Sequence, residues 1–144
     1  MAFGQALAPL LGRWVMAWFF LTQAYHYAAD WDNTAILLTM KNVPLPPVLL
    51  AIVLAAIVLG SLSLLVGFYT RAGAGLLFVI AVVTTVTLHD FWHIRAAAAR
   101  SADYDIFARN VAIAGGLLIL IGMGAGRFGI DNAKPMGGNW KSKR

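Results

Sequence analysis

The sequence contains no cysteine among its 144 residues. This absence excludes disulfides, thiolate metal sites, iron–sulfur clusters and covalent haem attachment. Charge is also scarce, because only 12% of the residues are Asp, Glu, Lys or Arg, about half of what soluble domains carry. Apolar residues make up 60% of the chain, and its mean hydropathy is +0.75. The composition therefore predicts a single membrane-embedded domain with no separate soluble module.

The longest stretches without charge lie in the middle of the chain. No charged residue occurs between Lys41 and Arg71, and none between Arg71 and His89. A hydrocarbon core roughly 30 Å thick is crossed by about 20 apolar residues of helix. Two such segments, joined at a single arginine, predict a helical hairpin in lipid.

Further apolar segments flank this hairpin, so we predict an all-α, integral membrane four-helix bundle. The predicted helices cover residues 7–29, 48–68, 72–92 and 106–126. Pro9 would lie in a first turn, where proline is tolerated. Pro44, Pro46 and Pro47 predict an extended entry into the second helix, because proline cannot continue a helix interior.

The distribution of basic residues predicts the orientation. An even number of spans places both termini on one side, together with seven basic residues: Arg13, Arg71, Arg127, Lys134, Lys141, Lys143 and Arg144. Four basic residues would lie opposite: Lys41, Arg95, Arg100 and Arg109. Because Lys and Arg concentrate on the cytoplasmic side, both termini are predicted to be cytoplasmic. Residues 1–132 would form the membrane domain and residues 133–144 a basic cytoplasmic tail; no nucleic-acid-binding motif is visible.

Glycine and serine recur within the predicted helices, at Gly60, Ser61, Ser63, Gly67, Gly73, Gly75, Gly115 and Gly116. Small residues allow helix backbones to approach closely in lipid, so we interpret them as packing positions. Gly124, Gly126 and Gly129 match the spacing G-x-G-x-x-G, but that nucleotide-binding motif needs a preceding strand. Here an apolar helix precedes it, and the glycines are predicted to end that helix instead.

All three histidines fall on the outer face in this topology. His89 and His93 are four residues apart and would share one side of the third helix, with Asp90 between them. His26 lies near the outer end of the first helix, which can face the third helix across a bundle. We therefore predict an outward-opening pocket with His89 as its most important member, His26 opposite, and Asp90 orienting or relaying a proton.

This pocket would suit a quinone headgroup. Imidazoles at His89 and His93 can bond the quinone carbonyls and exchange protons with water. Trp92, Tyr25 and Tyr27 would form its aromatic and hydrogen-bonding walls. Two alternatives remain open: two histidines at this spacing are a common half of a metal site, and histidines at a helix end often only anchor it at the headgroups. No complete metal-ligand set is present, so no metal ligand is assigned.

Arg13 is the other ionisable residue within an apolar run. It lies near the predicted cytoplasmic end of its helix, from where a long side chain can snorkel to the headgroups. We interpret it first as a topology anchor and second as an anion contact.

Three segments together resemble the DoxX family of small four-helix membrane proteins. They are Val43-Pro-Leu-Pro46 with the helix ending Leu65-Val-Gly67-Phe-Tyr-Thr-Arg71, then Leu88-His-Asp-Phe-Trp92, and the tail Gly124-Ala-Gly-Arg127-Phe-Gly-Ile-Asp131. Arg13 and Phe20 also resemble the first segment of that family, so the resemblance covers about residues 10 to 132. Family members often carry a lysine late in the first helix and a glutamate in the second. Here those positions lie near Tyr27 and near Ala56 or Ile57.

The resemblance implies a multi-pass protein of a bacterial or archaeal plasma membrane. Relatives include the membrane subunit of thiosulfate:quinone oxidoreductase and subunits associated with quinol oxidases, so the implied theme is electron transfer near the quinone pool. Three functions follow as hypotheses. The first is a quinone-interacting subunit of an oxidoreductase complex, in contact with lipid and with redox partners. The second is a non-catalytic anchor or assembly subunit. The third is metal binding or export through the outer histidines.

Overall fold

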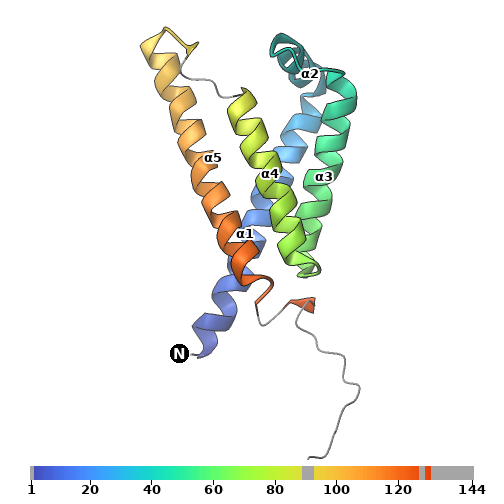
Figure 1. Cartoon of the computed structure of the whole chain (residues 1–144), viewed down its shortest axis with the longest axis vertical. Helices are drawn as coiled ribbons and strands as arrows, with labels where there is room; N and C mark the ends of the chain where they lie inside the picture. The colour runs from blue at the N-terminus through green and yellow to red at the C-terminus, as the bar shows by residue number, and fades with distance from the viewer. Residues whose placement is uncertain (1, 89–92, 127–128, 131–144) are drawn as a thin grey trace, which may run out of the picture.

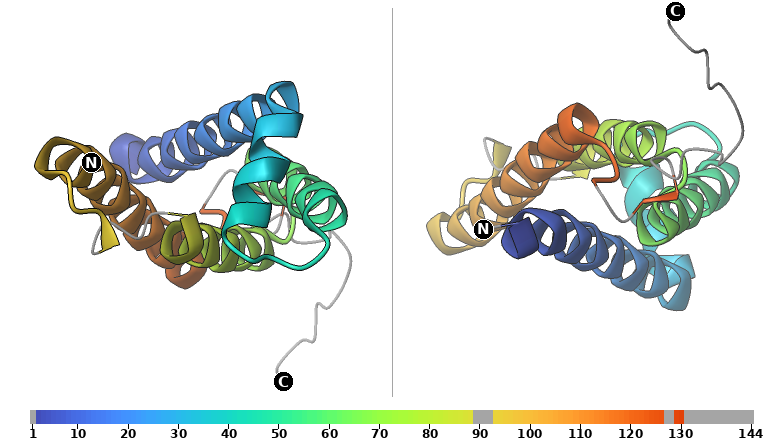
Figure 2. Two further views of the ribbon diagram at one scale, coloured as in Figure 1. Left: turned by 90° about the horizontal axis from the view of Figure 1, so that it is seen from above. Right: turned by 90° about the horizontal axis from the view of Figure 1, so that it is seen from below.

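The computed structural model describes residues 2–88, 93–126 and 129–130, with side chains from residue 7 onward. The described residues form five α-helices: α1 (Ala2–Ala29), α2 (Trp31–Met40), α3 (Pro46–Val66), α4 (Thr70–Leu88) and α5 (Ala97–Met123). The four long helices run side by side, and the short α2 lies across one end of them (Figures 1 and 2). We call this the α2 end, and the opposite end, which holds the α3–α4 turn, the turn end.

Three of the described helices, α3, α4 and α5, are long and apolar enough to cross a membrane. At most 28% of their most apolar stretches is buried inside the protein, and large side chains such as Val15, Leu59 and Val83 remain exposed. Exposed apolar area on this scale is unfavourable in water and normal in lipid. The chain is therefore a multi-pass membrane protein. Helix α1 has comparable length, but Arg13 and Gln23 lower its hydropathy.

The helix boundaries differ from the sequence-based expectation, since α1 begins at Ala2 and not at residue 7, and the predicted end of the third helix at residue 92 lies outside the described residues. Three further differences have a clear physical reason. Pro46 and Pro47 were expected to precede the second helix, but they occupy the first two positions of α3. A backbone N–H in the first turn has no partner within the helix, so proline, which lacks this N–H, is favourable there. Helix α5 begins at Ala97, well before residue 106, because its first turns are alanine-rich and form helix outside the apolar run. The short helix α2 was not predicted; Asp30 accepts hydrogen bonds at its start from Asn33 (2.6 Å) and from the hydroxyl of Thr34 (2.8 Å).

Small residues hold α3 and α4 together, as the sequence predicted. A Cβ on Gly60 would lie 2.8 Å from Cγ of Leu77 and 3.3 Å from the carbonyl oxygen of Gly73. A Cβ on Gly73 would in turn collide with the side chain of Ser63. The buried core consists of small and aliphatic residues and one phenylalanine: Ala17, Phe20, Ala24, Ile57, Leu64, Ala74, Leu77, Ala81, Leu117 and Leu120.

Two of the glycines interpreted as packing positions have another environment. A Cβ on Gly75 or on Gly115 would have no neighbouring atom within 4 Å, so these residues face away from the neighbouring helices. Gly116, next to Gly115, does pack, because a Cβ there would collide with the side chain of Met16. One residue rotates the helix by about 100°, and only the packing shows which of two adjacent glycines faces a neighbour.

The α3–α4 turn depends on Gly67, which does not share the packing role of Gly60. Gly67 ends α3 in the left-handed conformation with φ +74°, and its N–H donates to the carbonyl oxygen of Ser63 at 2.9 Å. The Ser63 hydroxyl donates to the carbonyl oxygen of Phe68 at 2.6 Å. Glycine tolerates this conformation without a steric penalty, which explains the abrupt reversal between α3 and α4.

Arg13 lies buried at the turn end, with only 1% of its surface exposed. Its guanidinium occupies the space beside Gly67 and Gly129: a Cβ on Gly67 would collide with Nη1, and one on Gly129 would lie 3.0 Å from it. The expectation that this side chain snorkels to the surface was wrong, because two glycines from other segments leave room for it inside. The residue thereby connects α1, the α3–α4 turn and the segment after α5.

A second arginine joins α4 to the end of α5. Nη2 of Arg71 donates to the carbonyl oxygen of Gly122 at 3.2 Å. Helix α5 ends at Met123, before residue 126, and the first of the glycines predicted to end it, Gly124, is its C-cap, with φ +72° and an N–H that donates to the carbonyl oxygen of Leu120 at 2.8 Å. A positive charge beside the last carbonyls of a helix is favourable, since those carbonyls carry the negative end of the helix dipole.

We predict that Gly60→Leu destabilises the protein, because a larger side chain must force α3 away from Leu77 and Gly73. Overpacking a tight contact costs about 1–3 kcal/mol, so the midpoint of thermal unfolding in detergent should fall. Gly75→Leu is the matched control, since that position has open space around it. Equal unfolding midpoints for the two variants would contradict the described α3–α4 contact.

We predict that Gly67→Ala also lowers the unfolding midpoint, whereas Gly12→Ala does not. Alanine at Gly67 adopts a left-handed conformation, at a cost of about 1 kcal/mol, and displaces the guanidinium of Arg13. Gly12 lies inside α1 with open space around it. Gly67→Asn separates the two causes, because Asn tolerates the left-handed backbone but still fills the space beside Arg13. If the Asn variant unfolds at the same temperature as the unsubstituted protein, the space that Gly67 leaves for the guanidinium of Arg13 does not contribute to stability.

Candidate functional site

A cavity of about 230 Å³ lies at the α2 end, between α1, α2, α3 and α4. We call it the α2-end cavity. Aliphatic side chains, among them Leu50 and Val53 of α3, form most of its wall. Four residues that carry hydroxyl groups, Tyr27, Thr34, Thr84 and Thr87, also line it, although its surface is almost wholly apolar. An apolar chamber with a few hydroxyl groups suits a small, largely apolar molecule that carries one or two hydrogen-bonding atoms.

The inward position of Tyr27 follows from the packing of α1. Phe20 and Ala24 are buried in the core, and Tyr27 follows them at the i, i+4, i+7 spacing that keeps side chains on one face of a helix. His26 is rotated from this face by about 100°. The same contacts that bury Phe20 therefore direct the phenol of Tyr27, and not the imidazole of His26, towards the cavity.

The four hydroxyls differ in what they offer a ligand. Thr34 donates its proton to the carbonyl oxygen of Asp30 at 2.8 Å, and Thr84 donates to that of Ile80 at 2.7 Å. These two can only accept a further hydrogen bond. Within the part of the chain that the structure describes, the hydroxyl of Tyr27 makes no hydrogen bond. The half-buried phenol of Tyr27 is therefore a donor available to a ligand.

The positive charge of Arg109 in α5 acts on the hydroxyl of Tyr27. Because guanidinium groups remain protonated in proteins, this charge is permanent. A partial negative charge on an oxygen near Tyr27 would be favoured by it. This charge belongs to the surroundings of Tyr27, because Arg109 itself does not line the α2-end cavity.

A second, smaller cavity of about 30 Å³ lies among α1, α3, α4 and α5. We call it the amide pocket, because the carboxamides of Gln23 in α1 and Asn110 in α5 line it together with Thr85 of α4. Tyr27 and Thr84 line both cavities. The two cavities therefore meet at one shared wall.

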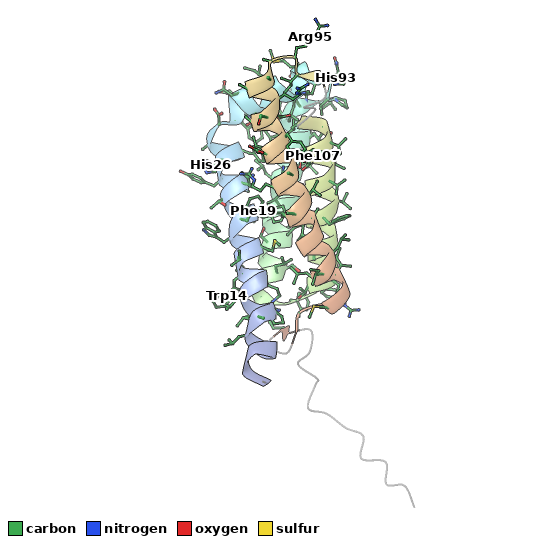
Figure 3. All side chains as sticks on the ribbon, turned by 90° about the vertical axis from the view of Figure 1, so that its left-hand side faces the viewer. Trp14, Phe19, His26, His93, Arg95 and Phe107 are labelled. Carbon is green, nitrogen blue, oxygen red and sulfur yellow. The ribbon has the colours of Figure 1, made fainter. Side chains whose placement is uncertain are left out.

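The predicted site residues do not gather in one place, and Figure 3 shows two of them, His26 on α1 and His93 near the start of α5. Tyr27 lines the α2-end cavity. His26 and Tyr25 are exposed on α1, where their rings pack edge to face at 5.9 Å, and neither lines the two cavities. Tyr25 is 71% exposed. His93 is exposed in the segment before α5, beyond the end of α4, and so does not belong to that helix.

Three predicted site residues, His89, Asp90 and Trp92, lie outside the described residues. Within the described ranges, no group of three or more His, Cys, Asp or Glu residues could hold a metal ion.

Four residues that line the two cavities were not predicted as site residues: Gln23, Thr84, Thr85 and Asn110. A signal was available, because a carboxamide inside an apolar membrane helix is costly and usually faces the protein interior. Gln23 lies within α1, and Asn110 begins the apolar part of α5. Their convergence with two threonines of α4 depends on the order of helices around the bundle.

Comparison with known proteins identifies the chain. The model of the DoxX family matches residues 8–90, more than half of its length. The chain belongs to the DoxX family. No curated protein and no solved structure matches it. The matched part of this DoxX protein contains every residue that lines the α2-end cavity, from Tyr27 to Leu88, whereas Asn110 lies beyond it.

Proposed function

We propose that this DoxX protein is a quinone-binding membrane subunit, with the quinone ring held in the α2-end cavity. The observation that supports the proposal is the hydroxyl of Tyr27, a half-buried donor that makes no hydrogen bond within the described part of the chain and lines an apolar chamber. Buried tyrosine hydroxyls usually have a partner. A quinone carbonyl oxygen would supply one.

The size and chemistry of the cavity fit a quinone ring. A dry cavity of about 150 Å³ is enough to bind benzene, and this one, of about 230 Å³, leaves space for ring substituents. The aliphatic wall from α3 and α4 matches the ring faces. Tyr27 would donate to one carbonyl oxygen, and the charge of Arg109 would favour electron density there. A bound quinone supplies the capacity to accept electrons and protons.

The histidines have a part in this proposal as proton-exchanging groups. His89 follows directly after Leu88 of the cavity wall, so we propose that it exchanges protons between the site and outside water, with Asp90 orienting it. Imidazole is suited to this task because its ordinary pKa lies near neutrality. His26 and His93, which are exposed, would exchange protons at the surface. Trp92 and Tyr25 remain proposed aromatic neighbours of the headgroup.

We propose four spans, with α1 as the first and both termini in the cytoplasm. Helix α1 is 28 residues long and runs beside α3 (Figure 1). Basic residues are fewer at the α2 end, which favours its placement on the outside of a bacterial or archaeal plasma membrane. The domain boundary near residue 132 and the cytoplasmic position of the basic tail, residues 133–144, belong to the same proposal.

Electrons would come from a partner subunit. The chain contains no cysteine, and the described residues include no cluster of metal ligands. The protein would therefore supply binding and orientation, while a redox partner in or on the membrane supplies the electrons. A purely structural anchor or assembly subunit is the competing function, and it requires no ligand in the α2-end cavity.

We predict that Tyr27→Phe weakens quinone binding about fivefold, the equivalent of one lost hydrogen bond. Tyr25→Phe is the matched control, because it is the same change at a nearby residue that faces away from the cavity. The measurement is the dissociation constant of a short-chain quinone for the purified protein in mild detergent, read from tryptophan fluorescence. Absence of saturable binding to the unsubstituted protein would support the anchor function instead.

We predict that a cysteine at Ser101 reacts with a membrane-impermeant maleimide in intact cells, and that a cysteine at Ser142 reacts only after lysis. Ser101 lies exposed in the first turns of α5, on the side proposed to be outside. Because the chain has no cysteine of its own, each introduced thiol reports one position. The reverse labelling pattern would invert the proposed orientation.

A further inference from the structure

The amide pocket raises the question of what its polar side chains bind. Gln23 and Asn110 come from different helices and line the same space. Within the described residues, neither carboxamide forms a hydrogen bond to another side chain or to the backbone. Lipid supplies no hydrogen-bond partner, and an unsatisfied amide in such surroundings is costly. Some polar partner must therefore reach both groups.

The size of the pocket identifies that partner. A water molecule needs a cavity of at least about 10–15 Å³ and two to four polar neighbours. The amide pocket has about 30 Å³, and Gln23, Asn110, Thr85 and Tyr27 all line it. The space is too small for an organic ligand and large enough for a water molecule.

We propose that the amide pocket binds an ordered water molecule that bridges Gln23, Asn110 and the hydroxyl oxygen of Tyr27. A phenol oxygen can accept one hydrogen bond while its O–H donates another. With the water donating to Tyr27 from the amide pocket, the O–H of Tyr27 turns towards the α2-end cavity. Thr84, on the shared wall, cannot compete as a donor, because its proton is held by Ile80.

Through this water, Gln23 and Asn110 orient the hydroxyl of Tyr27 and so act as positioning residues for the ligand. They lie on the far side of Tyr27 from the α2-end cavity and act through its hydroxyl. The second half of the inference rests on the proposed function, since it concerns a quinone bound in that cavity. The first half, the water itself, stands without any ligand.

The first experiment detects the water directly. Solid-state NMR of the protein in lipid, with magnetisation transferred from water to the side-chain amides, should show fast transfer to Asn110 and Gln23. Both side chains are half-buried. Amide signals that receive no magnetisation from water would overturn the inference, whether or not the protein binds quinone.

The second experiment tests the coupling to Tyr27. Asn110→Leu, which replaces the carboxamide by an apolar side chain of similar size, should weaken binding of a short-chain quinone about threefold, as expected for the loss of a bridging water. In a Tyr27→Phe background the same substitution should have no further effect. Ala112→Leu is the matched control, because Ala112 is exposed on α5 and does not line the pocket. An equal loss in both backgrounds would show that Asn110 does not act through Tyr27.

A third variant keeps the test valid if Asn110→Leu does not fold. Asn110→Ser replaces the carboxamide by a hydroxyl, which can still bond the water, and leaves more room, so it should preserve both the water contact of Gln23 and most of the quinone affinity. Loss of the water contact in this folded variant would contradict the bridge. If the unsubstituted protein binds no quinone but its amides contact water, the proposed function fails while the water site stands.

Discussion

The structure depends on one constraint, that lipid offers no hydrogen-bond partner to a polar group along the length of the helices. Hydroxyls within the helices accordingly donate to carbonyl groups one turn earlier, as Ser61 does to Ile57 and Thr84 to Ile80. Arg71 donates across to the end of α5. The carboxamides of Gln23 and Asn110 face a common pocket. Polar side chains therefore mark the interior of this protein more clearly than apolar ones.

Close packing of small residues makes this arrangement possible. Gly60 and Gly73 allow α3 and α4 to approach, and the turn at Gly67 then leaves room for the guanidinium of Arg13. Lipid provides no hydrophobic drive between helices, so such close contacts contribute much of the association. The α3–α4 contact at the turn end also fixes the direction of α4, and with it the position of Thr84 on the cavity wall.

The proposed function follows from the residues that line the α2-end cavity. That cavity, of about 230 Å³, lies beneath the short helix α2 and includes Tyr27 in its wall, whereas the larger cavity of about 610 Å³ between α1 and α5 near the turn end is lined by apolar residues such as Met16 and Met123. Tyr27 lies where the α2-end cavity meets the amide pocket. One phenol can thus bond a ligand on one side and a water molecule on the other, which connects ligand affinity to residues that the ligand does not contact.

The all-helical, membrane-embedded class, the DoxX family and the approximate limits of α3 and α4 could be predicted from the residues alone, because length and hydropathy are local properties. The packing of Gly60 and the helix end at Gly124 were predicted too. Tyr27 was predicted as one wall of a site but ranked below His26, and Gln23 and Asn110 were missed. These helices are apolar on nearly all sides, so periodicity does not indicate which face is inward. Tertiary packing decides which face is inward, because that face is the one whose small residues contact those of neighbouring helices. Successive residues differ by a rotation of about 100°, so packing that turns Tyr27 inward leaves His26 outside.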